Sequence, residues 1–135
     1  MVEQMSDTGT DGPSALKDPD GQHPIAGAWR PMLCEVVRRL VARDYSLAHG
    51  VPGVEPVSQT TAEQIRRYLG GYPATLVELP DDTWRTSVAQ WMETHWDILV
   101  DLWTAEEGPS DLVLGGKVVE TSTGPRLTVD MVYVP

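Results

Sequence analysis

The chain has 135 residues, of which 41% are apolar and 22% charged, enough for one hydrophobic core but not for two independent domains. Twenty acidic residues against ten basic ones give a formal net charge of −10, which argues against nucleic-acid binding because that function needs surplus Lys and Arg. No apolar run approaches the roughly 18 residues of a membrane span, and the acidic N-terminus is unlike a signal peptide. We therefore expect a soluble cytoplasmic protein that does not bind membranes.

The first residues, 1–23, are polar and rich in Gly, Pro and Ser, and they show neither a helical nor a strand period. Such a segment buries too little apolar surface to offset the entropy of ordering it, so we expect a disordered acidic tail. Residues 24–135 then form a single domain. Its first periodic stretch, between Met32 and Val41, carries an apolar stripe typical of an amphipathic helix. We expect this helix to end between Tyr45 and His49, ahead of Gly50 and Pro52.

A second helix is predicted to begin at the capping-box pattern Thr60-Thr61-Ala62-Glu63 and to end at Gly70-Gly71. Residues 74–79 are equally consistent with a short strand and with an extended link. Beyond them, large residues recur at helical spacing and predict a third helix. Those residues are Trp84, Val88, Trp91, Met92, His95 and Trp96.

Three β-rich runs follow, at 97–104, 112–121 and 127–134, separated by turn-prone loops. In the first run Asp97, Leu99, Asp101 and Trp103 alternate with apolar residues and should share one face. Gly115-Gly116 interrupts the second run, and we favour a bulge there over a turn. The predicted fold class is α+β, with two or three N-terminal helices packed on a C-terminal three-stranded antiparallel meander.

Charge is unevenly distributed along the chain. Residues 21–70 hold six arginines against four acids, whereas residues 71–116 hold nine acids against Arg85 alone. A surface of one sign attracts a partner of the opposite sign, and a tryptophan among carboxylates suits Arg or Lys side chains. The residues expected to contact a basic partner are Asp97, Asp101, Trp103, Glu106, Glu107 and Asp111.

No catalytic motif accompanies these residues, and no cofactor or metal is implied. His95 precedes Asp97 and has the type of neighbour that a general base needs, but no nucleophile is marked beside it. Cys34, the only cysteine, falls near the apolar stripe of the first helix and reads as a core residue. If the face of Asp101 is covered by helices, its charge needs Arg, Lys or backbone donors nearby.

The stretch from Trp96 to Leu112, W-D-I-L-V-D-L-W-T-A-E-E-G-P-S-D-L, followed by a last strand ending at Tyr133-Val134-Pro135, resembles a family of small bacterial proteins known only as a domain of unknown function. In that family a V-D-L-[WY]-T strand runs through E-E-G-x-S-D-L into the next strand. The resemblance implies an α+β fold and a bacterial cytoplasmic origin, without an activity. In size and charge the chain is also similar to immunity proteins that neutralise toxins.

These observations favour a non-catalytic acidic binding protein, immunity- or antitoxin-like, that captures a basic protein partner. The alternative is a small metal-assisted hydrolase that uses the carboxylates of Asp101, Glu106, Glu107 and Asp111. A homodimer formed through a sheet edge or the tryptophan-rich segment is a third alternative.

Overall fold

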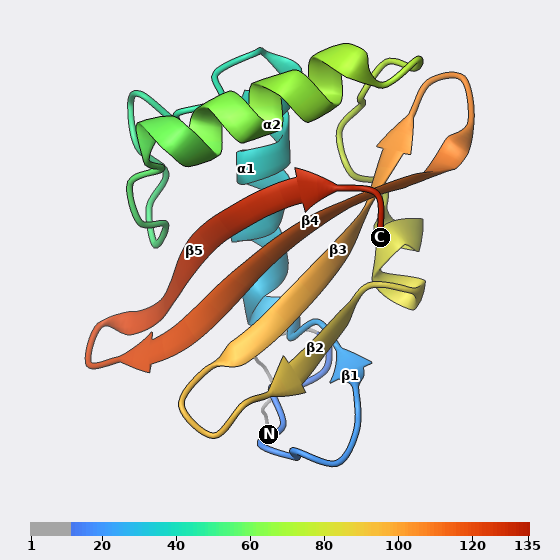
Figure 1. Ribbon diagram of the computed structural model, residues 1–135. Coiled ribbons are helices and arrows are strands. Elements are labelled where there is room, and N and C mark those ends of the chain that lie inside the picture. The colour runs from blue at the N-terminus through green and yellow to red at the C-terminus, as the bar shows by residue number, and fades with distance from the viewer. Residues whose placement is uncertain (1–11) are drawn as a thin grey trace, which may run out of the picture.

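A single antiparallel sheet and two helices make up the fold, seen in the computed structural model that describes residues 12–135 (Figure 1). In chain order the elements are β1 (His23–Pro24), a 3-10 helix (Gly27–Trp29), α1 (Arg30–Val41), α2 (Gln59–Gly71), a second 3-10 helix (Asp81–Arg85), β2 (Val88–Trp91), β3 (Trp96–Thr104), β4 (Gly108–Thr121) and β5 (Gly124–Tyr133). Neighbours in the sheet follow the order β1-β2-β3-β4-β5. No helix in residues 12–135 is long and apolar enough to cross a bilayer.

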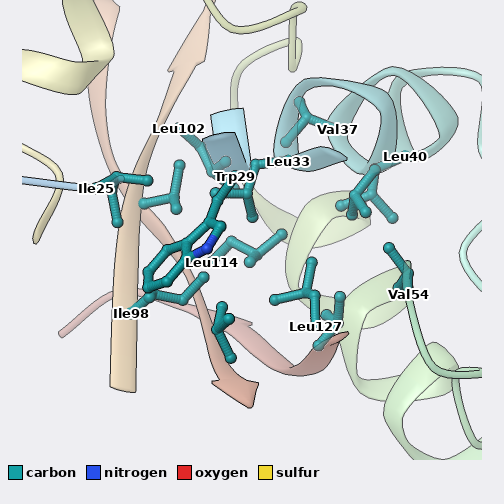
Figure 2. Close-up of a cluster of buried hydrophobic side chains, with 14 of the residues drawn as sticks. Ile25, Trp29, Leu33, Val37, Leu40, Val54, Ile98, Leu102, Leu114 and Leu127 are labelled. Atoms are coloured by element: carbon teal, nitrogen blue, oxygen red, sulfur yellow. The ribbon is translucent and has the colours of Figure 1, made fainter. Parts of the chain in front are cut away.

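The core lies between α1 and one face of the sheet. On α1, Leu33, Val36, Val37 and Leu40 are buried, as the apolar stripe predicts. They face alternate residues of the central strands, and Figure 2 shows this cluster with Trp29 beside it. Each fully buried side chain of this size contributes about 1.5–3 kcal/mol relative to an exposed one. This packing fixes which face of the sheet is covered.

The predicted three-stranded meander is wrong, because two further strands complete a five-stranded sheet. The predicted third helix does not form. Trp84 lies in the second 3-10 helix, Val88–Trp91 form β2, and Trp96 opens β3. The large residues of two strands and the tight turn between them happen to recur at helical spacing. In this turn the Met92 N–H donates to the His95 carbonyl at 2.7 Å. Residues 88–91 form a strand because their backbone pairs with β3.

Helix α1 ends at Val41, earlier than predicted, because the chain turns back through a Schellman motif. The Asp44 N–H donates to the Arg39 carbonyl at 2.9 Å, and the Arg43 N–H donates to the Leu40 carbonyl at 3.0 Å. Arg43 takes a left-handed conformation with φ of 66°, at the position where glycine is usual. An L-residue with a side chain costs roughly 1–2 kcal/mol in this conformation.

Helix α2 begins at Gln59, and its N-cap is Ser58 rather than the predicted Thr60. The Ser58 hydroxyl accepts a hydrogen bond from the Thr61 N–H at 3.1 Å. The cap therefore precedes the predicted box by two residues. Figure 1 shows α2 lying across the end of the sheet near β5.

The N-terminal segment that the structure describes contacts the domain before β1 begins. The indole N–H of Trp96 donates to the Leu16 carbonyl at 2.9 Å, and the Gly27 N–H donates to the Pro13 carbonyl at 2.8 Å. The predicted tail spans 1–23, and its residues 1–11 lie outside the described part of the chain. Residues 12–22 thus form part of the surface near Trp96.

Where β3 extends past β2, its backbone is completed by side chains and a loop. The Asp101 N–H donates to the buried Ser87 hydroxyl at 2.9 Å, and the Thr83 hydroxyl donates to the Asp101 carbonyl at 2.5 Å. Further along, the Val77 N–H donates to the Trp103 carbonyl at 3.0 Å. Residues 74–77 are thus an extended link that makes one isolated bridge to β3, not a strand of the sheet.

The opposite edge, β5, is closed in the same way. The Gln64 side-chain amide donates to the Val132 carbonyl at 2.6 Å and accepts from the Val132 N–H at 3.2 Å, so it replaces one residue of a neighbouring strand. Near the other end of β5, Leu127 exchanges backbone hydrogen bonds with Gly53 and Glu55, both at 2.8 Å. These backbone groups are therefore not free to pair with a second molecule.

The Gly115-Gly116 pair lies within β4, which continues through it unbroken. A register shift occurs here, because Gly115 pairs with Met131 and Gly116 with Val129. The predicted irregularity is therefore a bulge and not a turn, and the extra residue is Asp130 on β5. A Cβ on Gly116 would lie 2.6 Å from the Thr128 carbonyl oxygen, whereas a Cβ on Gly115 would meet nothing nearer than 3.5 Å.

Replacing Gly116 with alanine is expected to lower the free energy of unfolding by about 1–3 kcal/mol, because the new methyl group meets backbone that cannot move without disturbing the strand pair. Gly115→Ala, its matched control, is expected to change that free energy by less than about 0.5 kcal/mol. Urea unfolding of both variants measures the difference, and equal midpoints for the two would contradict the geometry.

Candidate functional site

The face of the sheet opposite α1 carries no helix in the described part of the chain, and it is turned toward the viewer in Figure 1. We call this side of β2–β5 the open face. Burial alternates strictly along β3, so Asp97, Leu99, Asp101 and Trp103 share this face while the residues between them are buried against the helices. The predicted alternation is confirmed. Other residues of the open face include Val88, Gln90, Val113, Gly115, Lys117, Val119, Thr128, Met131 and Tyr133.

A hollow of about 350 Å³ lies on the open face, above the backbone of Gly115. The missing side chain creates it, since the neighbours Leu99, Met131 and Tyr133 surround the space that a Cβ would enter. Its lining is mixed. The apolar members are Val88, Leu99, Met131 and Tyr133, and the polar members include Gln22, Gln90, Asp97, Lys117 and Asp130. A depression of this composition suits a side chain that is apolar along its length and charged at its end.

Charged groups border the hollow at one end. The Lys117 ammonium binds the Asp130 carboxylate at 2.7 Å. This hydrogen bond, with the nearby charges of Asp130 and Asp97, raises the pKa of Lys117 above its ordinary value. The Asp97 carboxylate lies 3.0 Å from His95 Nε2 and pairs with no Lys or Arg among residues 12–135. Asp97 thus forms no salt bridge with Lys or Arg in residues 12–135, although Lys117 stands directly opposite it on β4.

Asp101 lies half-buried on the open face, where no helix covers it. Its carboxylate accepts a hydrogen bond from the Thr86 hydroxyl at 2.5 Å and has no Arg or Lys partner in the described part of the chain. The ion pair expected for a covered Asp101 is therefore not formed. One strand carries both Asp97 and Asp101, separated by four residues and so by about 13 Å.

Trp103 lies at the end of the open face, beside the β3–β4 turn. Its ring passes over Gly108, where a Cβ would stand 3.7 Å from the indole, and Gly108 has a φ of 73°. The indole N–H is buried and has no acceptor among residues 12–135. The half-buried indole therefore contributes packing, and its N–H makes no hydrogen bond to the described chain.

Of the remaining predicted site residues, Glu106 and Glu107 belong to the β3–β4 turn and Asp111 to β4, and all three contact another part of the chain. The Glu106 carboxylate accepts from the Thr75 N–H at 2.7 Å and the Thr75 hydroxyl at 2.9 Å. The Glu107 carboxylate accepts from the Tyr72 hydroxyl at 2.9 Å, and the Asp111 N–H donates to the same hydroxyl at 3.3 Å. These contacts hold residues 72–75 against the turn.

The six predicted residues thus separate into two groups: Asp97, Asp101 and Trp103 on the open face, and Glu106, Glu107 and Asp111 around residues 72–75. Sequence reasoning missed Gly115, Lys117, Asp130 and Tyr133, which lie beside the first group. The alternation of β5 and the glycine pair in β4 were the available signals. The side-by-side register of β3, β4 and β5 was not available from the sequence.

The four carboxylates of the hydrolase alternative do not converge. Asp101 binds Thr86, while Glu106 and Glu107 bind Thr75 and Tyr72. Among residues 12–135, no three His, Cys, Asp or Glu side chains gather closely enough to hold a metal ion.

Two further groups with catalytic chemistry lie outside any enclosed site. Thr94, His95 and Asp97 form a hydrogen-bonded chain, with His95 Nδ1 at 2.9 Å from the Thr94 hydroxyl. Thr94 is exposed in the β2–β3 turn, where bulk water competes with any acyl acceptor. Burial, followed by the negative charge of Asp81, raises the pKa of Cys34, which keeps this thiol protonated at neutral pH.

Comparison with known proteins places this arrangement in a family. A family model described as Domain of unknown function (DUF7668) matches residues 37–135, most of the chain. The chain belongs to the DUF7668 family. The matched region contains α2, β2–β5 and thus the strands of the open face, and it includes the turn whose motif carried the resemblance noted above. No curated protein and no solved structure matches the chain.

The turn of this DUF7668 domain gives a pH-dependent prediction. The backbone and hydroxyl donors of Thr75 lower the pKa of Glu106 from its ordinary value of 4.5. Its stabilising contribution is therefore complete above pH 4.5 and is lost as the pH falls through the lowered folded-state pKa. Glu106→Gln should be less stable than the natural chain at neutral pH, and the two should converge in acid.

Urea unfolding at a series of pH values measures this difference. Thr75→Val removes one of the two donors, so its difference from the natural chain should be smaller than that of Glu106→Gln. A Glu106→Gln difference that stays constant from pH 7 to pH 3 would contradict the assignment.

Proposed function

We propose that the protein is a non-catalytic binding protein that receives a basic protein partner on the open face of its sheet. The observation that carries the proposal is the hollow above Gly115, which the Asp97 carboxylate borders. Asp101 lies further along β3 on the same face. Neither carboxylate forms a salt bridge with Lys or Arg in residues 12–135, so each can accept a cationic group from a ligand.

Charge separates the two layers of the fold and favours the sheet layer as the binding surface. Helices α1 and α2 carry five arginines against two glutamates, a net of +3, whereas strands β2–β5 carry five acids against two bases, a net of −3. A basic partner is therefore attracted to the strands and repelled by the helices.

The chemistry of the hollow suits Lys and Arg side chains. A long aliphatic stem fits over Leu99, Met131 and Tyr133, and its cationic end then reaches Asp97. The Tyr133 ring offers a further face to a guanidinium. Apolar contact at the centre with charge at the rim is the usual anatomy of a protein interface.

Sheet edges are less suited to the same role. Gln64, Thr83 and Ser87 already satisfy edge backbone groups of β5 and β3, and residues 53–55 pair with Leu127. Strand addition by a partner, or by a second copy, would have to displace these bonds. The exposed side chains of the open face can be contacted without breaking any of them.

An immunity- or antitoxin-like role follows from this proposal, in a bacterial cytoplasm as the sequence resemblance implies. Proteins of this kind present an acidic surface to the basic groups of a toxin, and the analogy here rests on size and charge. The partner is thus expected to be a protein with a basic surface.

The test compares two double variants of equal charge change. Asp97→Asn with Asp101→Asn removes two acidic charges from the open face, while Glu63→Gln with Glu120→Gln removes two acidic charges from α2 and the outer end of β4. Tagged chains are used to capture partners from the source cell at low and high salt, and captured proteins are identified by mass spectrometry. Circular dichroism confirms that both variants fold.

We expect the natural chain and the Glu63/Glu120 variant to retain one basic protein at low salt and to release it at high salt, as screening requires. The Asp97/Asp101 variant should retain at least tenfold less, about the change from loss of 1.4 kcal/mol. Equal capture by both variants, or no basic protein captured by the natural chain, would refute the proposal.

A further inference from the structure

A second depression, of about 630 Å³, opens on the helix layer, between the C-terminal ends of α1 and α2 and residues 72–76. We call it the helix-end cleft. None of the open-face residues lines it. It is larger than the hollow above Gly115 and within the range of small-molecule sites.

The lining of the helix-end cleft is unusual for a chain with a net charge of −10. Arg43 and Arg66 both line it, and no Asp or Glu does. The rest of the lining is mainly aliphatic and aromatic: Leu40, Val41, Tyr45, Leu69, Tyr72 and Leu76. Two guanidiniums beside exposed aliphatic and aromatic side chains match a ligand with a negative group at one end and an apolar body.

The two arginines are available to different degrees. Arg66 uses Nη2 to bind Glu63 one turn earlier on α2, and a guanidinium has five N–H donors, so others remain. Arg43 forms no ion pair with a carboxylate among residues 12–135. Thr75 also lines the cleft, and its N–H and hydroxyl bind the carboxylate of Glu106.

Arg43 also occupies a backbone position that its side chain makes costly. The Schellman motif at the end of α1 requires a positive φ, and glycine would satisfy it without strain. Residues held in such conformations are concentrated where a side chain serves a ligand. The guanidinium that this backbone places on the helix-end cleft is the feature that a glycine would remove.

We propose that the helix-end cleft binds a small organic anion with a planar apolar body. Its carboxylate, sulfonate or phosphate group lies between the guanidiniums of Arg43 and Arg66. The body rests on Val41, Leu69 and Leu76, with the Tyr45 and Tyr72 rings beside it. An inorganic anion lacks the apolar body and binds far more weakly.

The probe is 1-anilinonaphthalene-8-sulfonate, an aromatic sulfonate whose fluorescence rises in apolar surroundings. Fluorescence and calorimetric titrations of the natural chain should show one site. Arg43→Gly should weaken binding at least tenfold while leaving the thermal midpoint unchanged or raised, because glycine relieves the strained backbone. Loss of affinity in a chain that is no less stable cannot come from unfolding. Arg66→Gln should weaken binding as well, and millimolar sulfate should not displace the probe.

Glu93→Gly is the matched control, since Glu93 is also an exposed non-glycine residue with a positive φ, of 74°, and lies in the β2–β3 turn. This variant should leave the probe affinity unchanged, and its thermal midpoint should be equal to or higher than that of the natural chain. Probe affinity that survives Arg43→Gly, or a natural chain that does not bind the probe, would overturn the proposal. So would binding lost in Met131→Glu and kept in Arg43→Gly, since the probe would then occupy the open face.

Discussion

Because α1 buries its apolar stripe against one face of the sheet, every other surface of the domain is defined by what this contact leaves uncovered. Leu33, Val37 and Leu40 pack in one core with the residues of β3–β5 that alternate toward them. The same alternation sends Asp97, Leu99 and Asp101 to the opposite side. The open face is thus a direct consequence of core packing. The two layers also differ in charge, because the strands carry more acids than bases and the helices more bases than acids.

The two candidate sites use these layers differently. On the open face, an absent side chain at Gly115 makes room between strands, and carboxylates stand at the border. On the helix layer, two helix ends and residues 72–76 leave a larger space bordered by guanidiniums. The β3–β4 turn lies between them, since Glu106 and Glu107 fasten residues 72–75 while Trp103 belongs to the open face. The hydrogen bonds of this turn therefore hold residues 72–75, which line the helix-end cleft, and the turn itself lies beside the open face.

Local patterns predicted the elements that owe their form to nearby residues. The stripe of α1, the alternation of β3 and the bulge at Gly115-Gly116 depend on periods and residue types within a few positions, and all three are present. Errors arose where distant partners decide the structure. Residues 84–96 show a helical spacing, yet pairing with β3 makes β2 a strand. Hydrogen bonds from the chain that follows to the Arg39 and Leu40 carbonyls end α1 in a Schellman motif, ahead of the predicted stop at Gly50.

For the candidate site, the sequence placed Asp97, Asp101 and Trp103 on one face but joined them to three other acids. Of these, Glu106 and Glu107 bind Thr75 and Tyr72 through their carboxylates, and Asp111 contacts Tyr72 through its backbone N–H. Charge counts along a sequence do not reveal which carboxylates a hydroxyl or an N–H of the same chain will bind. The hollow above Gly115 and the helix-end cleft were equally out of reach, because each is assembled from three or more elements distant in the chain.

The side-chain amide of Gln64 affects how the β5 edge of the sheet can interact with other chains. Because it binds both the N–H and the carbonyl of Val132, the Gln64 side chain blocks an edge of the sheet where another strand could otherwise pair. Strand-rich proteins with bare margins are prone to stack into insoluble assemblies. In this protein the Gln64 side chain, rather than a proline or a lysine, protects the β5 edge at Val132. Resistance to aggregation at high concentration therefore depends at this point on a single residue of α2.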